Sequence, residues 1–346
     1  MHLNSLNHFR AITIIIIVAG HSYSHVGLEF SGILDNSLKN MISGGTSLFV
    51  FISGFLFHHV FYKKFHYSKF VGKKVRNVLI PYLILGFLPA LWWVILKQEK
   101  CGEFFLGTEE NFISEYVVPM IKYYATGVFI NGYWYVPFIM LTFSISPIHA
   151  RYIKLSTNKQ LSLILLLSCV SMVIHRPIQN VNVFQSVVYF TPVYLIGITA
   201  SIHRNVIYNT FNKREYLLLL FAAALAVLQA YLGHEGNYHK QPLAIGTIDI
   251  MYLQKTLLCF FFMVWLHRFE NYNNSYVHAV ASTSFTAFFI HPYILWLLRK
   301  ADLSFIKTDS WFVLLMFVAI LQLTCVLIAK VTKKLIPKYS RFFIGY

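Results

Sequence analysis

The chain has 346 residues, of which 57% are hydrophobic, 17% aromatic and only 12% charged. Soluble domains usually carry about twice that charged fraction, and the apolar residues here come in repeated runs long enough to cross a bilayer, which favours an integral membrane protein. The formal net charge of +16 is spread over short loops between these runs, which argues against a nucleic-acid-binding protein.

Ten apolar runs follow one another along the chain, and they predict an all-α integral membrane protein with about ten transmembrane helices. Pro and Gly within a run do not argue against a helix there, because membrane helices tolerate both residues. We expect no separate soluble domain, so that residues 1–346 form a single transmembrane domain. The predicted spans are 9–26, 41–61, 77–96, 132–149, 161–174, 184–202, 215–232, 249–267, 279–298 and 311–330.

The distribution of charge predicts how these spans are oriented. If residues 1–10 are cytoplasmic and the spans alternate, the inside segments hold 19 of the 29 Lys and Arg residues and only two of the 13 Asp and Glu residues. Basic loops remain in the cytoplasm during membrane insertion. We therefore expect both termini to be cytoplasmic and the number of spans to be even.

Among the ionisable residues of the first predicted span are Arg10 and His21, which are eleven positions apart. On a helix this spacing places both side chains on nearly the same side, roughly 16 Å apart along the axis. An ionisable side chain within an apolar span is costly and marks a functional site by default. In the structural alternative, Arg10 reaches the lipid headgroups and His21 is hydrogen-bonded between helices.

The most basic segment is the predicted inner loop 62–76, which includes Lys73 and Arg76. One interpretation is an anchor at the anionic lipid headgroups. The other is a phosphate site, because several cations on one short loop can hold a polyphosphate group.

Five short motifs occur in a fixed order along these spans. They are Arg10 and His21, Gly45 with Ser53-Gly54-Phe55, Lys73 and Arg76 followed by Ile80-Pro81-Tyr82, Trp134-Tyr135-Val136-Pro137, and Phe288-Phe289-Ile290-His291-Pro292. Over about residues 5 to 330 the chain thereby resembles membrane-bound acyltransferase family 3, whose members O-acetylate or otherwise acylate cell-surface sugars. Two positions depart from the family pattern: Ser47 stands where Asp or Pro is frequent, and Lys73 replaces an Arg.

The resemblance implies a reaction and roles for its residues. His21 would be the general base that removes the proton of a sugar hydroxyl, or would itself carry the acyl group in a relay. Arg10, Lys73 and Arg76 would hold the phosphates of acetyl-CoA or another acyl-CoA, and Arg10 also belongs to the predicted catalytic pair. The acceptor would be a surface glycan or its lipid-linked precursor, such as that of a lipopolysaccharide, at a bacterial inner membrane.

Four further residues have both a site role and a structural alternative. Ser53 either lines an acyl tunnel or lets two helices pack closely. Trp134 and Tyr135 either line the site or belong to the aromatic belt at the membrane surface. His291 either contributes to the site or makes a packing hydrogen bond beside Pro292. No metal or dinucleotide motif is present, and we expect no metal.

Two other functions also fit a chain of about ten spans. The first is a transporter or flippase for a polysaccharide or its precursor, although the internal repeats common in transporters are not evident. The second is a membrane acyltransferase of another class that modifies lipids or proteins. The position of Arg10 and His21 in the first span, rather than late in the chain, argues against that class.

Overall fold

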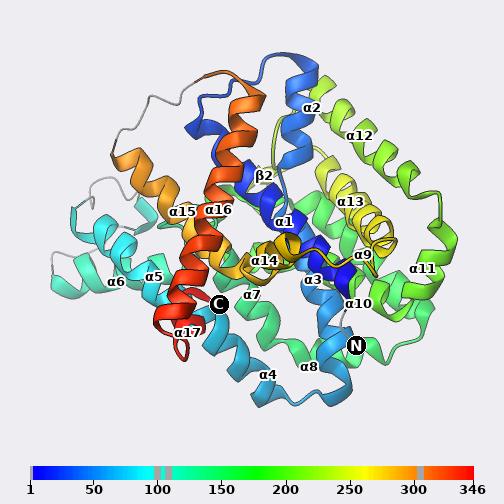
Figure 1. Cartoon of the computed structure of the whole chain (residues 1–346), viewed down its shortest axis with the longest axis horizontal. Helices are drawn as coiled ribbons and strands as arrows, with labels where there is room; N and C mark the ends of the chain where they lie inside the picture. Colours follow the sequence, from blue (N-terminus) through cyan, green and yellow to red (C-terminus); the bar gives the residue numbers. More distant parts are fainter. Residues whose placement is uncertain (1–2, 97–102, 106–110, 302–307) are drawn as a thin grey trace.

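The computed structural model describes residues 3–96, 103–105, 111–301 and 308–346, and within them the fold is almost entirely helical (Figure 1). The α-helices in the N-terminal half are α1 Asn4–Ser22, α2 Gly32–Ile42, α3 Thr46–Leu56, α4 Tyr67–Lys74, α5 Ile80–Leu91, α6 Val118–Thr126, α7 Tyr135–Ser144, α8 Ser146–Ile153 and α9 Thr157–Ile174. Those in the C-terminal half are α10 Val183–Ile202, α11 Arg204–Phe211, α12 Glu215–Tyr231, α13 Ile250–His267, α14 Ser275–Ser282, α15 Ser284–Lys300, α16 Trp311–Leu335 and α17 Ser340–Ile344.

Short helical turns of other kinds extend or join these helices. Turns of π-helix follow several of them and keep the chain helical, so that α4 and α5 form part of one continuous helix over 67–96. The π turns are η2 Phe57–Phe61, η4 Val75–Leu79, η5 Trp92–Leu96 and η8 Ile113–Val117, and the 3₁₀ turns are η1 Tyr23–His25, η3 Tyr62–Lys64, η7 Glu103–Phe105 and η9 Ile178–Asn180.

The described residues include six helices that are long and apolar enough to cross a membrane, or up to eight if each bent helix pair is one span. The bent pairs are α11 with α12, at 85°, and α14 with α15, at 68°. The predicted runs 9–26 and 132–149 fall on α1 and on α7 with α8, which do not meet the same criteria of length and hydropathy. A multi-pass, all-α membrane protein is thus confirmed, while the count of ten and the side of the termini stay predictions.

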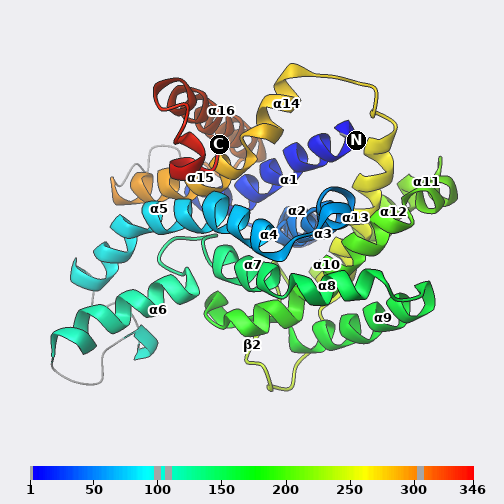
Figure 2. The ribbon, with the colours of Figure 1, turned by 90° about the horizontal axis from the view of Figure 1, so that it is seen from below.

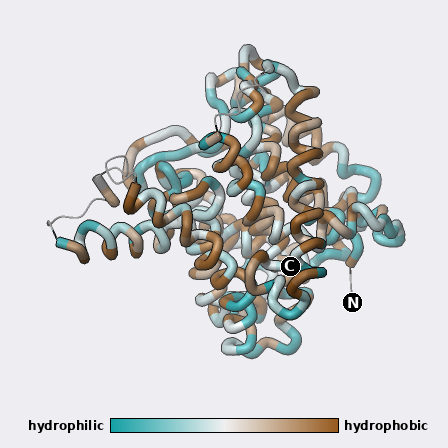
Figure 3. The backbone as a smooth tube through the Cα atoms, turned by 60° about the vertical axis from the view of Figure 1, so that its left-hand side comes forward, coloured by the Kyte–Doolittle hydropathy of each residue, from teal (hydrophilic) through white to brown (hydrophobic). Residues whose placement is uncertain are grey.

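Apolar side chains cover much of the outside of the molecule, as a lipid-facing surface requires. On α16, exposed apolar residues recur along the whole helix, namely Phe312, Leu315, Met316, Ile320, Leu323, Leu327 and Val331. Figure 3 shows the hydrophobic residues following the long helices and the hydrophilic ones gathering in the connections. These exposed apolar side chains are therefore suited to contact the hydrocarbon of the bilayer instead of water.

Helix α1 lies at the centre of the arrangement, which places Arg10 and His21 inside the protein. It packs against α3, α13, α14, α15 and α16, and Figures 1 and 2 show it enclosed by them. Gly45, just before α3, allows a close approach, because a Cβ atom there would lie 2.8 Å from Cγ1 of Ile17. The helix that carries the predicted catalytic pair is thus closely packed against its neighbours.

Helices α3 and α10 pack more extensively than any other pair, and a glycine on each makes this contact possible. A Cβ atom on Gly54 would collide with the backbone carbonyl of Tyr194, and one on Gly197 with that of Phe51. Close approach through small residues is a common way for membrane helices to associate.

The β structure of the described part of the chain is one very short sheet. Strand β1, Arg176–Pro177, pairs in parallel with β2, His239–Lys240, with Arg176 opposite His239. The sheet joins two loops that are about sixty residues apart in sequence and brings both of these side chains to the edge of one cavity.

Candidate active site

His21 forms a pair with His291 that joins the first helix to α15. The Nδ1 atom of His21 lies 2.9 Å from Nε2 of His291, and Nδ1 of His291 lies 2.5 Å from the carbonyl oxygen of Ala287. Since a carbonyl oxygen only accepts, Nδ1 of His291 carries a proton and its Nε2 is an acceptor. His21 therefore donates from Nδ1, and its Nε2 keeps a free lone pair, as a general base requires.

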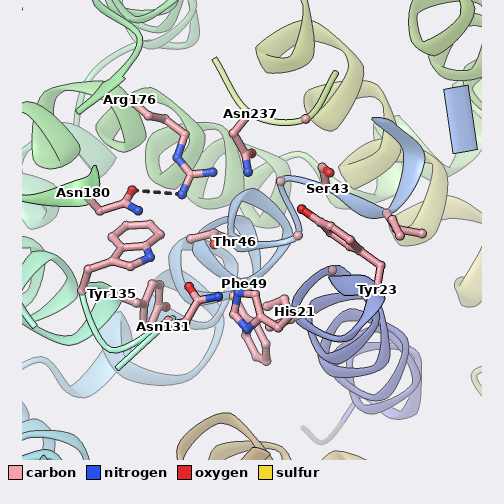
Figure 4. Close-up of a pocket in the computed structure, with 18 of the residues that line it drawn as sticks. His21, Tyr23, Ser43, Thr46, Phe49, Asn131, Tyr135, Arg176, Asn180 and Asn237 are labelled. Atoms are coloured by element: carbon pink, nitrogen blue, oxygen red, sulfur yellow. Dashed lines mark hydrogen bonds between the residues drawn. The ribbon is translucent and has the colours of Figure 1, made fainter. Parts of the chain in front are cut away.

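A polar cavity of about 350 Å³ opens beside His21 (Figure 4). The Gly44-Gly45 turn before α3 and the Asn131-Gly132 turn before α7 both border it. Gly132 has a φ of +89°, and a Cβ atom there would lie 3.1 Å from Cε1 of His21, so glycine allows this turn to pack on the imidazole ring. The polar residues that line the cavity include Tyr23, Lys39, Ser43, Thr46, Asn131, Arg176, Asn180, Glu235, Asn237 and His239.

A second cavity, of about 160 Å³, lies further along α1 toward its N-terminus and is mostly apolar. Arg10 borders it and donates a hydrogen bond from Nη2 to Oγ of Ser284, at 2.9 Å. Ser53 lines the same cavity and hydrogen-bonds Tyr135. Its remaining walls are largely aromatic and aliphatic side chains.

A third cavity, of about 400 Å³, adjoins the second and is basic. Its lining includes Arg10, Lys73, Lys74 and Arg341, together with the C-terminal residue Tyr346. The ammonium of Lys74 lies over the aromatic rings of Phe143, Phe61 and Phe70, at 4.3, 5.0 and 5.3 Å from their centroids. No acidic side chain is among the residues that line this cavity.

The three cavities adjoin one another along the face of α1 that carries Arg10 and His21. The polar and apolar cavities share Phe49, Tyr135 and Phe288 in their walls. The apolar and basic cavities share Arg10, Phe61, Lys74, Val78 and Phe285. A basic chamber, an apolar waist and a polar chamber therefore follow one another in this order.

The structure brings most of the predicted site residues together. Arg10, His21, Ser53, Lys73, Trp134 and Tyr135 line the three cavities, and His291 contacts His21. Arg76 is exposed and does not line these cavities. The roles assigned to all eight residues stay predictions.

Several residues of these cavities were missing from the sequence-based prediction. Lys74, next to the predicted Lys73, lines both the apolar and the basic cavity, whereas Lys73 lines the basic cavity. The orientation of α4 about its axis decides which of the two lysines reaches the apolar cavity. Arg176 and Asn131 carry no signal in a single sequence, because loop packing alone brings them to His21. Within the described ranges, no group of three or more His, Cys, Asp or Glu side chains could hold a metal ion.

Comparison with known protein families agrees with the resemblance seen in the motifs. Residues 3–329 match the family model of the acyltransferase domain of acyltransferase family 3. No curated protein and no solved structure gives a significant match to the chain. Since the family model covers nearly the whole chain, the protein belongs to this family and is a membrane acyltransferase.

Proposed function

We propose that this protein transfers an acetyl or similar acyl group from acyl-CoA to a hydroxyl of a cell-surface glycan or of its lipid-linked precursor, in a bacterial inner membrane. The observation that carries the proposal is the position of His21, which lines a polar cavity that an apolar waist joins to a basic one and whose Nδ1 is engaged by His291.

The basic cavity suits the nucleotide end of the donor. Arg10, Lys73, Lys74 and Arg341 supply positive charge, and no acidic side chain is among the lining residues, which favours phosphate groups. The apolar waist suits a narrow, flexible chain that ends in a thioester. With the basic side in the cytoplasm, as the charge distribution predicts, the thioester would reach His21 from inside and the acceptor would enter from outside.

The chemistry needs one base and one polarising donor. Nε2 of His21 accepts the hydroxyl proton while the hydroxyl oxygen attacks the thioester carbonyl carbon. The tetrahedral intermediate then expels the thiolate of CoA, which takes the proton from His21, and the products are the ester and free CoA. The amide of Asn131, which Figure 4 shows beside His21, is the group we expect to stabilise the oxyanion.

A transporter or flippase fits these cavities less well than an acyltransferase. A saccharide carries many hydroxyl groups that need hydrogen bonds, and the waist offers mainly aromatic and aliphatic walls. A passage of that kind favours an acyl or pantetheine chain over a hydrated sugar.

The experiment that tests the proposal compares His21→Ala with His25→Ala. His25 lies one turn further along, bonds the carbonyl oxygen of Leu295 and does not line the cavity, so it is a matched control. Mass spectrometry of surface polysaccharide, together with release of free CoA by purified protein, reports acyl transfer. We expect His21→Ala to lower the rate by at least about 100-fold and His25→Ala to stay close to the wild type. Glycan translocation without any acyl transfer would favour the transporter instead.

A further inference from the structure

The polar cavity contains one positive charge that no group of the described residues neutralises at contact distance. Three of its lining residues carry full charges, and two of them, Lys39 and Glu235, form an ion pair at 2.7 Å. The third, Arg176, makes no ion pair with any of the described residues. Its guanidinium is held from the side by aromatic rings, with Cζ at 4.9 Å from the centroid of Trp134 and 5.7 Å from that of Phe190.

The hydrogen bonds of Arg176 are also incomplete. Arg176 is only 5% exposed, and its buried Nε has no hydrogen-bond partner among the described residues. The one hydrogen bond that the guanidinium makes within the described residues runs from Nη2 to Oδ1 of Asn180, at 3.3 Å. Since Arg has five N–H donors, most of them are free for a ligand.

Asp249, the acidic group whose charge acts on Arg176, is engaged elsewhere. Its Oδ2 accepts a hydrogen bond from the hydroxyl of Tyr189 at 2.8 Å, and its Oδ1 accepts one from the backbone N–H of Tyr252 at 2.9 Å, where it caps α13. The negative charge of Asp249 therefore lowers, from a distance, the cost of burying the Arg176 guanidinium. Asp249 does not accept a hydrogen bond from the N–H groups of that guanidinium. A buried cation without a paired anion is expensive, and a ligand anion would remove that cost.

The histidine of this cavity that adjoins Arg176, His239, does not compete for an anion. Burial, together with the nearby guanidinium of Arg176, lowers the pKa of His239 to about 4, so its ring is neutral near pH 7. Figure 4 shows Arg176, Asn180 and Asn237 on one side of the cavity and His21 on the other, with Thr46 between them. A substrate that fills the cavity would thus contact the base with one end and the guanidinium with the other.

We propose that Arg176 binds a carboxylate of the substrate, so that this acyltransferase selects a reaction partner that carries a carboxylate. The inference rests on the acyl transfer proposed above. The carboxylate belongs either to an acidic sugar of the acceptor or to the far end of a dicarboxylic acyl group on the donor. One guanidinium with free N–H groups matches a carboxylate in charge and shape.

The test measures binding to the purified full-length protein in lipid nanodiscs by isothermal titration calorimetry. Two matched pairs of probes separate the sources of the carboxylate: methyl glucuronide against methyl glucoside for the acceptor, and succinyl-CoA against acetyl-CoA for the donor. We expect the member of one pair that carries the additional carboxylate to bind about tenfold more tightly than its partner without it. The Arg176→Gln variant should reduce that preference to less than about threefold.

Two further variants separate the fork of Arg176 from positive charge in general. Arg176→Lys keeps the charge but loses the fork, so it should keep part of the preference, and it covers the case in which Arg176→Gln fails to fold. The double variant Lys39→Gln with Glu235→Gln removes the other two charges without changing the net charge and should leave the preference intact. The inference is overturned if the wild type shows no preference in either pair, undetectable binding included, or if Arg176→Gln weakens both members of a pair equally. Because binding needs no turnover, this result is independent of the His21→Ala assay.

Discussion

At the scale of single residues, the two histidines have different parts in the site. His291 is fixed by the carbonyl oxygen of Ala287, and that bond decides which nitrogen of His21 carries the proton. His21 then presents Nε2 as the base. His291 is accordingly a positioning residue, which acts through His21 rather than on the substrate.

Substitutions of His291 should separate positioning from packing. In His291→Gln, the side-chain carbonyl oxygen can still accept a hydrogen bond from Nδ1–H of His21, whereas the leucine side chain of His291→Leu cannot. We expect His291→Leu to lower kcat by about 10- to 100-fold, as the loss of an orienting partner does, and His291→Gln to recover much of that loss, with KM for acyl-CoA similar in both. Steady-state kinetics of CoA release measures this, and equal losses in the two variants would indicate a packing role only.

At the scale of helices, small residues decide how close the elements approach. The contact of α3 with α10 depends on Gly54 and Gly197. The Gly44-Gly45 turn at the polar cavity directly precedes α3, and Ser53 at the apolar waist lies on it. The position of α3 therefore sets the geometry of two of the three cavities.

Gly54→Ala should destabilise the protein, because the added methyl group would collide with the backbone of α10, which cannot move independently. Overpacking of this kind costs about 1–3 kcal/mol. Gly72→Ala is the control, since no atom lies within 4 Å of its Cβ position in α4. Thermal unfolding in detergent should give a lower midpoint for Gly54→Ala and an unchanged or slightly higher one for Gly72→Ala. Equal midpoints for the two variants would show that the helices can separate without cost.

At the scale of the whole molecule, the three cavities connect a basic side to a polar side through an apolar waist. The waist is the smallest of the three, at about 160 Å³, against about 350 and 400 Å³ for the polar and basic cavities. A molecule arranged in this way can hold the two ends of a reaction apart and let only a narrow chain pass between them.

Ser53→Phe should obstruct the waist and slow acyl transfer while leaving the basic cavity able to bind a nucleotide. We expect the rate of transfer to fall by at least about tenfold, because the thioester would no longer reach His21 in a reactive position. Ser144→Phe, at an exposed position of α7, is the matched control and should have little effect. The measurement pairs CoA release with binding of CoA, and a variant with normal turnover would show that the donor does not use the waist.

The sequence by itself determined the membrane class, the helical fold and the family. Apolar runs can be recognised without tertiary information, because their length must match the bilayer. Each of the motifs between Arg10 and Pro292 likewise lies within one short stretch of sequence. The alignment of Arg10 with His21 followed from helix geometry alone, and both residues line the adjoining cavities.

Only the tertiary structure decided which side chains share the polar cavity with His21. The pairing of His21 with His291 spans 270 positions, and the approach of Arg176 depends on a two-residue sheet with β2. Neither has a local signal, since contacts between distant loops arise from packing and not from the periodicity of one helix. It could not be predicted either that Lys74 rather than Arg76 lines the basic cavity, because this depends on how the helix packs against its neighbours.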